Sequence, residues 1–108
     1  MQDSEEITSI DYKRLLVIRS RRRSNIRKKI ADYLFEIYPV SSYTSEIADN
    51  VRTAPTNLIG AIKGMGTRYK KEESLIAIEL VEQVKSGNNI KLYKITDFGK
   101  EFMHNLKR

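Results

Sequence analysis

Small, polar and basic side chains lie together in one stretch near the middle of the chain. Leu58, Ile62 and Met65 recur at helical spacing, so a helix over residues 55–65 would bury them on one face. The opposite face then holds no carboxylate that would repel phosphate. Asparagine can pair with adenine through two hydrogen bonds, lysine suits phosphates, and glycine permits close approach of the helix backbone. The candidate DNA contacts on this helix are Thr56, Asn57, Gly60 and Lys63.

The positive charge of the chain is concentrated in three windows. The 108 residues carry a net charge of +6. Residues 12–31, 50–71 and 83–96 contain no acid and hold nine, five and three basic residues, seventeen of the twenty Lys and Arg. A solvated surface normally mixes the two signs, so this segregation favours a polyanionic partner. The further candidate contacts are Arg21, Arg22, Arg23, Arg52, Arg68, Lys70, Lys71 and Lys91. The three adjacent arginines could instead belong to an arm that only improves solubility.

A helix is predicted before this stretch. Residues 24–38 carry an apolar stripe at helical spacing, with Ser24 as the N-cap and Pro39 as the stop. Residues 7–23 are expected to form an N-terminal helix or an arm. The arm is an alternative because the apolar side chains of this segment follow the helical period poorly.

Two short helices separated by a turn position the candidate contacts. Residues 44–51 are predicted to form a helix capped by Thr44 or Ser45. Residues 52–54 interrupt the apolar pattern of this helix. Pro55 has no N–H and a fixed φ, which suits the first turn of a new helix. The stretch therefore predicts a helix-turn-helix.

The second half of the chain predicts a hairpin and a closing helix. Residues 86–89 read SGNN, which is turn chemistry between the β-prone runs LVEQVK and IKLYKIT. Before the hairpin, residues 69–79 suit either a strand or a buried helix, and we favour a helix to about Glu79. After it, Thr96 or Asp97 can cap a last helix.

This order of elements resembles the winged helix-turn-helix DNA-binding domains of archaeal and bacterial transcriptional regulators. EIADNVRTAPTNLIGAIKGM has the length and apolar register of the family's helix-turn-helix, and IKLYKITDFGKEF looks like a wing strand followed by the closing T-x-x-G-x-x-F segment. The resemblance covers residues 24–103. Two positions depart from the pattern: Arg52 stands where the turn usually has glycine, and Ala54 where Ser or Thr usually caps the second helix.

The resemblance implies a function. The helix over residues 55–65 would enter the DNA major groove, and the wing over residues 81–95 would touch the backbone or minor groove. The chain would be a sequence-specific, double-stranded DNA-binding transcriptional regulator. Terminal helices often pair in this family, which implies a homodimer. Its interface would use Phe98, Phe102 and Leu106, which otherwise would be ordinary core.

The expected architecture is therefore mainly α with a small β-hairpin wing, an α+β fold. A winged helix-turn-helix domain with a closing helix would occupy residues 24–108, and a helix or basic arm residues 1–23. Two other interpretations remain open. The same fold can serve as a protein-interaction module, and the same basic face can bind DNA without regard to sequence, as a chromosomal protein does.

Enzyme chemistry has little support in the sequence. His104 is the only histidine, no cluster of His, Asp and Glu has ligand spacing, and GMG is too short for a phosphate loop. We expect no enzyme, cofactor or metal site, and no small-molecule effector can be inferred. No apolar run approaches the length of a membrane span, and the absence of cysteine fits a cytoplasmic location.

Overall fold

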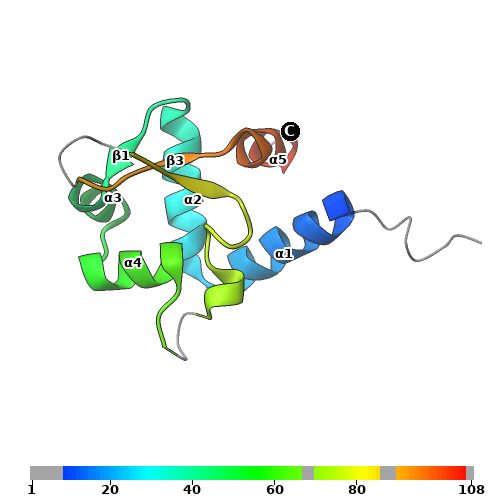
Figure 1. The fold of residues 1–108 in the computed structure, drawn as a ribbon, viewed down its shortest axis with the longest axis horizontal. Coiled ribbons are helices and arrows are strands. Elements are labelled where there is room, and N and C mark those ends of the chain that lie inside the picture. The colour runs from blue at the N-terminus through cyan, green and yellow to red at the C-terminus, as the bar shows by residue number, and fades with distance from the viewer. Residues whose placement is uncertain (1–8, 67–69, 86–89, 107–108) are drawn as a thin grey trace, which may run out of the picture.

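Five α-helices and a small antiparallel sheet form the part of the chain that this computed structural model describes, residues 9–66, 70–85 and 90–106. The predicted mainly helical α+β class is confirmed (Figure 1). The elements in chain order are α1 (Ser9–Arg23), α2 (Asn25–Ile37), β1 (Ser42–Tyr43), α3 (Thr44–Val51), α4 (Pro55–Lys63), the 3₁₀ helix η2 (Lys71–Glu73), β2 (Val81–Val84), β3 (Leu92–Ile95) and α5 (Asp97–Leu106).

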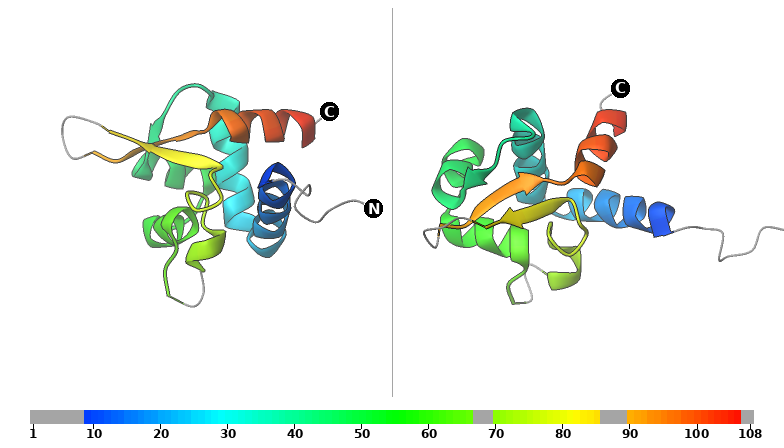
Figure 2. Two further views of the ribbon diagram at one scale, coloured as in Figure 1. Left: turned by 45° about the vertical axis from the view of Figure 1, so that its right-hand side comes forward. Right: turned by 45° about the horizontal axis from the view of Figure 1, so that its top comes forward.

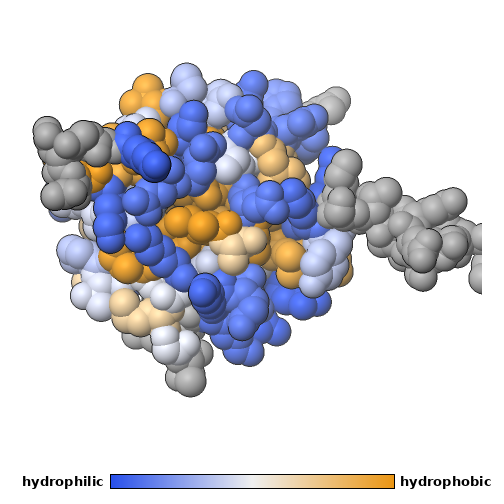
Figure 3. Space-filling view, in the orientation of Figure 1, coloured by the Kyte–Doolittle hydropathy of each residue, from blue (hydrophilic) through white to orange (hydrophobic). Residues whose placement is uncertain are grey.

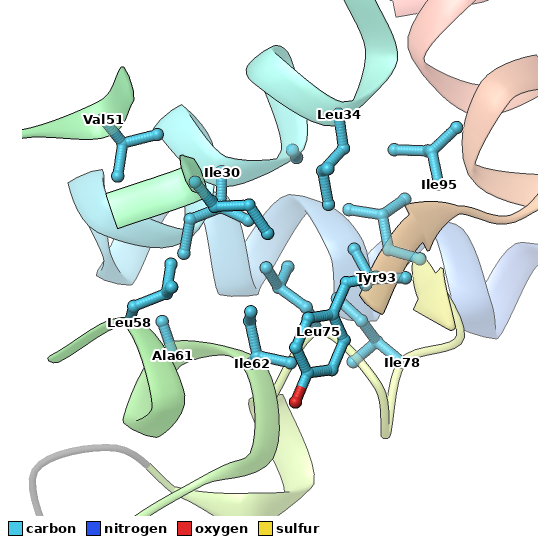
Figure 4. Close-up of a cluster of buried hydrophobic side chains, with 14 of the residues drawn as sticks. Ile30, Leu34, Val51, Leu58, Ala61, Ile62, Leu75, Ile78, Tyr93 and Ile95 are labelled. Atoms are coloured by element: carbon cyan, nitrogen blue, oxygen red, sulfur yellow. The ribbon is translucent and has the colours of Figure 1, made fainter. Parts of the chain in front are cut away.

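Helix α2 lies at the centre of the fold, with α3 and α4 on one side and α1 and α5 on the other (Figure 1, Figure 2). Ser24 is its N-cap, as predicted, and the Ser24 Oγ accepts a hydrogen bond of 3.2 Å from the Arg27 N–H. The helix ends at Ile37, two residues before Pro39. Its buried stripe contributes Ile30 and Leu34 to the core, which continues through α3, α4 and β3 (Figure 4).

The predicted helix-turn-helix is confirmed in α3 and α4. Arg52 in the turn has φ 56° and ψ 58°, a left-handed conformation that explains why glycine would be expected there. Pro55 occupies the first turn of α4, as predicted. The expected cap of α3 is wrong, because its N-cap is Tyr43 and no side chain caps the helix. Met65 is not core either: α4 ends at Lys63, and Met65 is 44% exposed.

The predicted hairpin is confirmed in β2 and β3, which pair antiparallel with Val81 opposite Ile95. Its turn, residues 86–89, lies outside the described residues. β1 adds a third strand beside β3, in the order β1–β3–β2. Two residues are too few to show an alternating pattern, so the sequence does not predict β1.

The helix favoured over residues 69–79 is wrong for the described part of that segment. η2 makes a single short 3₁₀ turn there, and turns follow it. The Leu75 N–H donates to the Ala61 carbonyl and the Ile76 N–H to the Ile62 carbonyl, both at 3.1 Å. The last carbonyls of α4 have no partner within their own helix, so they can satisfy this buried, non-helical backbone.

Helices α1 and α5 complete the fold at the side away from α3. α1 is a packed helix rather than an arm, because Val17 is fully buried and the Ser20 Oγ donates to the Glu73 carbonyl at 2.8 Å. Thr96 caps α5, as predicted, by accepting a 2.8 Å hydrogen bond from the Gly99 N–H. A Cβ at Gly99 would lie 2.6 Å from the Leu80 carbonyl oxygen, so only glycine fits there. Within the described residues, no helix has the length and apolar character that a bilayer crossing needs.

Candidate nucleic-acid interface

The residues on the solvent face of α4 differ in part from the four predicted DNA contacts. Thr56 is exposed, and Asn57 and Lys63 are partly exposed. Gly60 is buried, so the prediction that it brings the helix backbone close to DNA is wrong. Helical periodicity gives the direction in which Gly60 faces, but it does not show whether neighbouring atoms cover the glycine. Ile59 is partly exposed and does not belong to the core cluster or to the apolar side chains packed against it.

Lys63 links α4 to the hairpin. Its Nζ lies 5.9 Å from the centroid of the Tyr93 ring on β3, within the range of a cation–π contact. Tyr93 is fully buried among the apolar side chains (Figure 4), and burial raises the pKa of its hydroxyl, against a smaller lowering by Lys91. This contact holds the Lys63 ammonium between α4 and the sheet. The charge is therefore placed by the fold rather than left on a free side chain.

Two lysines stand next to the C-terminal end of α4. Gly64 has φ +92°, and a Cβ there would lie 2.6 Å from the Lys71 Cα, so the chain returns closely to the end of the helix. Lys70 and Lys71 are exposed, and within the described residues neither forms an ion pair. Arg68 lies outside the described residues. Two of the lysines predicted from the sequence as phosphate contacts therefore lie next to the end of α4.

The turn and the hairpin add isolated cations. Arg52 is exposed in the turn before α4, and Lys91 is exposed just before β3. Lys85 is exposed just after β2, so Lys85 and Lys91 flank the hairpin turn. In the parts of the chain that the structure describes, none of the three takes part in an ion pair.

The three adjacent arginines do not form a free basic arm. Arg21 lies in an ion pair with Asp32, with 3.5 Å between Nη1 and Oδ1, and Arg23 in one with Glu73, with 2.9 Å between Nη1 and Oε2. Arg22 is exposed, and no ion pair within the described residues involves it. The contact of these three arginines with phosphate stays a prediction. Two of the three charges already face carboxylates of the same chain.

A buried charge cluster that the sequence did not reveal lies behind these arginines. Arg27 is 2% exposed, and its Nη1 lies 3.6 Å from the Glu73 Oε1. Its Nη2 donates to the Lys70 carbonyl at 3.3 Å. Arg27, Ile30 and Leu34 stand at positions i, i+3 and i+7, so Arg27 lies on the apolar stripe of α2. This position in the sequence could have indicated that Arg27 is buried. The cluster anchors the segment that carries Lys70 and Lys71 to α2.

The predicted dimer residues of α5 have different surroundings. Phe102 is 8% exposed within a single chain, and its ring centroid lies 6.2 Å from that of the partly buried Phe98. Phe102 is therefore core, and the prediction that it forms an interface is corrected. Leu106 is exposed and borders a shallow hollow with Ile18 and Arg22.

Comparison with known proteins places the chain in a protein family. The model of the EarA-like family matches residues 17–106. Uncharacterized protein MJ0905 of Methanocaldococcus jannaschii is 46% identical over 92 residues, which is 85% of this chain and 82% of that protein. No solved structure is significantly similar to the chain. Since the family model spans most of the sequence, the chain belongs to the EarA-like family.

Proposed function

We propose that this chain is a sequence-specific, double-stranded DNA-binding transcriptional regulator of the winged helix-turn-helix type. The observation that carries the proposal is that α4 and the outer end of the β2–β3 hairpin lie on the same side of the molecule, away from α1 and α5 (Figure 1, Figure 2). A helix-turn-helix places its second helix in the major groove, where a hairpin beside it reaches the flanking backbone.

The charge on this side supports the same conclusion. Arg52, Lys70, Lys71 and Lys91 form no ion pairs within the described residues, so their charges are available to phosphate oxygens. Ala54 provides no side-chain cap, which leaves the first N–H groups of α4 without that partner. Such N–H groups and the helix dipole favour a phosphate at the start of the helix.

A gel-shift series with genomic fragments, repeated at several salt concentrations, tests the proposal. We expect one class of fragment to bind roughly a thousandfold more tightly than random DNA, with affinity falling as salt rises. Lys70→Glu with Lys71→Glu should abolish binding, whereas Lys100→Glu on α5 is the control that should leave it unchanged. Equal binding to all fragments would instead indicate a sequence-blind chromosomal protein, and no binding at all would refute DNA recognition.

A homodimer is part of the proposal, with an interface that keeps Leu106 and replaces Phe98 and Phe102 by side chains of α1. Tyr12, Leu15 and Ile18 are exposed at intervals of three residues along α1, and Leu106 borders the same hollow as Ile18. Pairing through these side chains would cover apolar surface that the monomer leaves in water. Sedimentation velocity should show a dimer for the unmodified chain and a monomer for Leu15→Asp. A monomeric unmodified chain would refute this part.

A further inference from the structure

We infer that the exposed surface of α4 reads thymine methyl groups in the major groove, with Ile59 as the specificity-determining residue and the Thr56 methyl beside it. The inference rests on the proposed DNA binding and specifies what the bound sequence must contain. Its basis is that Thr56 and Ile59 place methyl groups on the solvent-accessible side of α4.

The N-terminal half of α4 presents mostly carbon to solvent. Ala54, Pro55 and Thr56 are exposed, and Ile59 is partly exposed. The surface over α4 is mostly pale to orange in Figure 3, whereas the surface over η2 is blue. The partly exposed Asn57 carries the one side-chain amide in this helix.

Ile59 is only partly covered by the rest of the chain. The buried side of α4 is made by Leu58, Ala61 and Ile62, each without exposed surface. At 100° per residue, Ile59 turns away from that side and shares a face with Thr56 and Lys63. Ile59 also lies outside the core cluster and the side chains packed on it. A branched apolar side chain that keeps part of its surface in solvent therefore lies beside the exposed Thr56 on α4.

In the major groove, an isoleucine can discriminate base pairs through apolar contact. It has no hydrogen-bonding group, and the apolar feature of the major groove is the C5-methyl of thymine. The Thr56 side chain offers a methyl of its own, three residues earlier on the same face. Asn57 lies on a different side of the helix, but it can pair with adenine, the partner of thymine, so the amide and the methyls both favour A·T pairs. We therefore expect A·T pairs beneath the N-terminal half of α4.

Deoxyuridine substitution isolates the methyl group, because it removes the C5-methyl and keeps the base pair. In a synthetic duplex of the preferred fragment, each thymine is replaced in turn by deoxyuridine, and affinity is measured by fluorescence anisotropy. One or two positions should weaken binding about fourfold each, the value of one buried methyl group. No effect at any position would overturn the inference and leave the DNA-binding proposal intact. No preferred fragment would instead refute the proposal itself.

Variants assign the readout to its side chains. Ile59→Ala should bind the thymine and deoxyuridine duplexes equally at one position, whereas Ile59→Val, which keeps a branched methyl pair, should still distinguish them. Thr56→Ser keeps the hydroxyl and should lose discrimination at a second position. Met65→Ala removes an exposed apolar side chain beyond the end of α4 and is the matched control. Full discrimination retained by Ile59→Ala would overturn the assignment to Ile59. Thermal melts monitored by circular dichroism verify that each variant is folded.

Discussion

The corner between α1 and α2 and the surface around α4 are both rich in basic residues, but they use them differently. At the corner, Arg21 faces Asp32, and Arg23 and Arg27 converge on Glu73. Around α4, Arg52, Lys70, Lys71 and Lys91 have no ion pair within the described residues. The window of highest basic density, residues 12–31, holds nine Lys and Arg, and four of them form ion pairs within the described residues: Lys13, Arg21, Arg23 and Arg27.

The difference shows that a run of basic residues does not by itself mark a binding surface. Two carboxylates, Asp32 on α2 itself and Glu73 on η2, turn the α1–α2 corner into a structural joint. The Arg23–Glu73 pair spans 50 positions of sequence. The proposed DNA surface instead lies where the remaining cations adjoin a helix with an exposed N-terminal half.

The largest expected effect is on the structural joint. Glu73→Ala would leave the buried Arg27 guanidinium without its carboxylate, so the free energy of unfolding should fall by about 3–5 kcal/mol. Urea denaturation measures this change. Glu72→Ala alters the exposed neighbouring acid and should change stability by less than about 0.5 kcal/mol. Equal effects of the two substitutions would contradict the structural role of Glu73.

The second prediction separates the two faces of α4. Ile62 is fully buried, so Ile62→Ala should lower the free energy of unfolding by about 2–5 kcal/mol. Ile59→Ala removes the same atoms from the partly exposed face and should cost less than about 1 kcal/mol. Thermal or urea melts of both variants give the comparison. If Ile59→Ala proved the more destabilising, the assignment of the solvent face would be wrong.

The third prediction concerns base readout. Asn57→Ala should weaken binding to the preferred fragment by about 1–3 kcal/mol and relax the preference at one base pair. Binding to random DNA should change little, because the amide makes no charge contact with phosphate. Competition gel shifts measure the ratio of the two affinities. An unchanged ratio would exclude Asn57 as a base reader.

The smallest expected effect compares cations of the two regions directly. Lys70→Ala with Lys71→Ala should reduce the slope of log affinity against log salt by about 1.8, since each phosphate contact contributes roughly 0.9. Arg21→Ala should leave the slope unchanged, because that charge already pairs with Asp32. Binding titrations between low and moderate salt determine both slopes. A larger change for Arg21→Ala would restore the basic arm as a DNA contact.

Much of the fold could be predicted because its signals are local. Ser24 caps α2, Pro55 begins α4, and Thr96 caps α5, each through a residue within three positions of the backbone it affects. The hairpin followed from turn chemistry between two apolar runs. The segment after η2 could not be predicted in this way, because its backbone partners are carbonyls of α4.

The candidate surface could be predicted only in part. Thr56, Asn57, Lys70 and Lys71 were identified correctly as solvent-facing or partly so. Gly60 and Phe102 were assigned to surfaces, and both are buried, because a helical period gives the direction of a residue but not what lies opposite it. Ile59 was overlooked, since an isoleucine beside an apolar stripe is ordinarily taken as core.

The sequence by itself determined where the helices of the helix-turn-helix and the hairpin strands lie, because caps, proline, turn residues and apolar spacing act over a few positions. Only the tertiary structure decided which cations are free. Glu73 on η2 meets Arg23 of α1 and Arg27 of α2, and Lys63 on α4 meets Tyr93 of β3. An ion pair needs its partner within a few ångströms, and that distance is set by the packing of elements far apart in the chain.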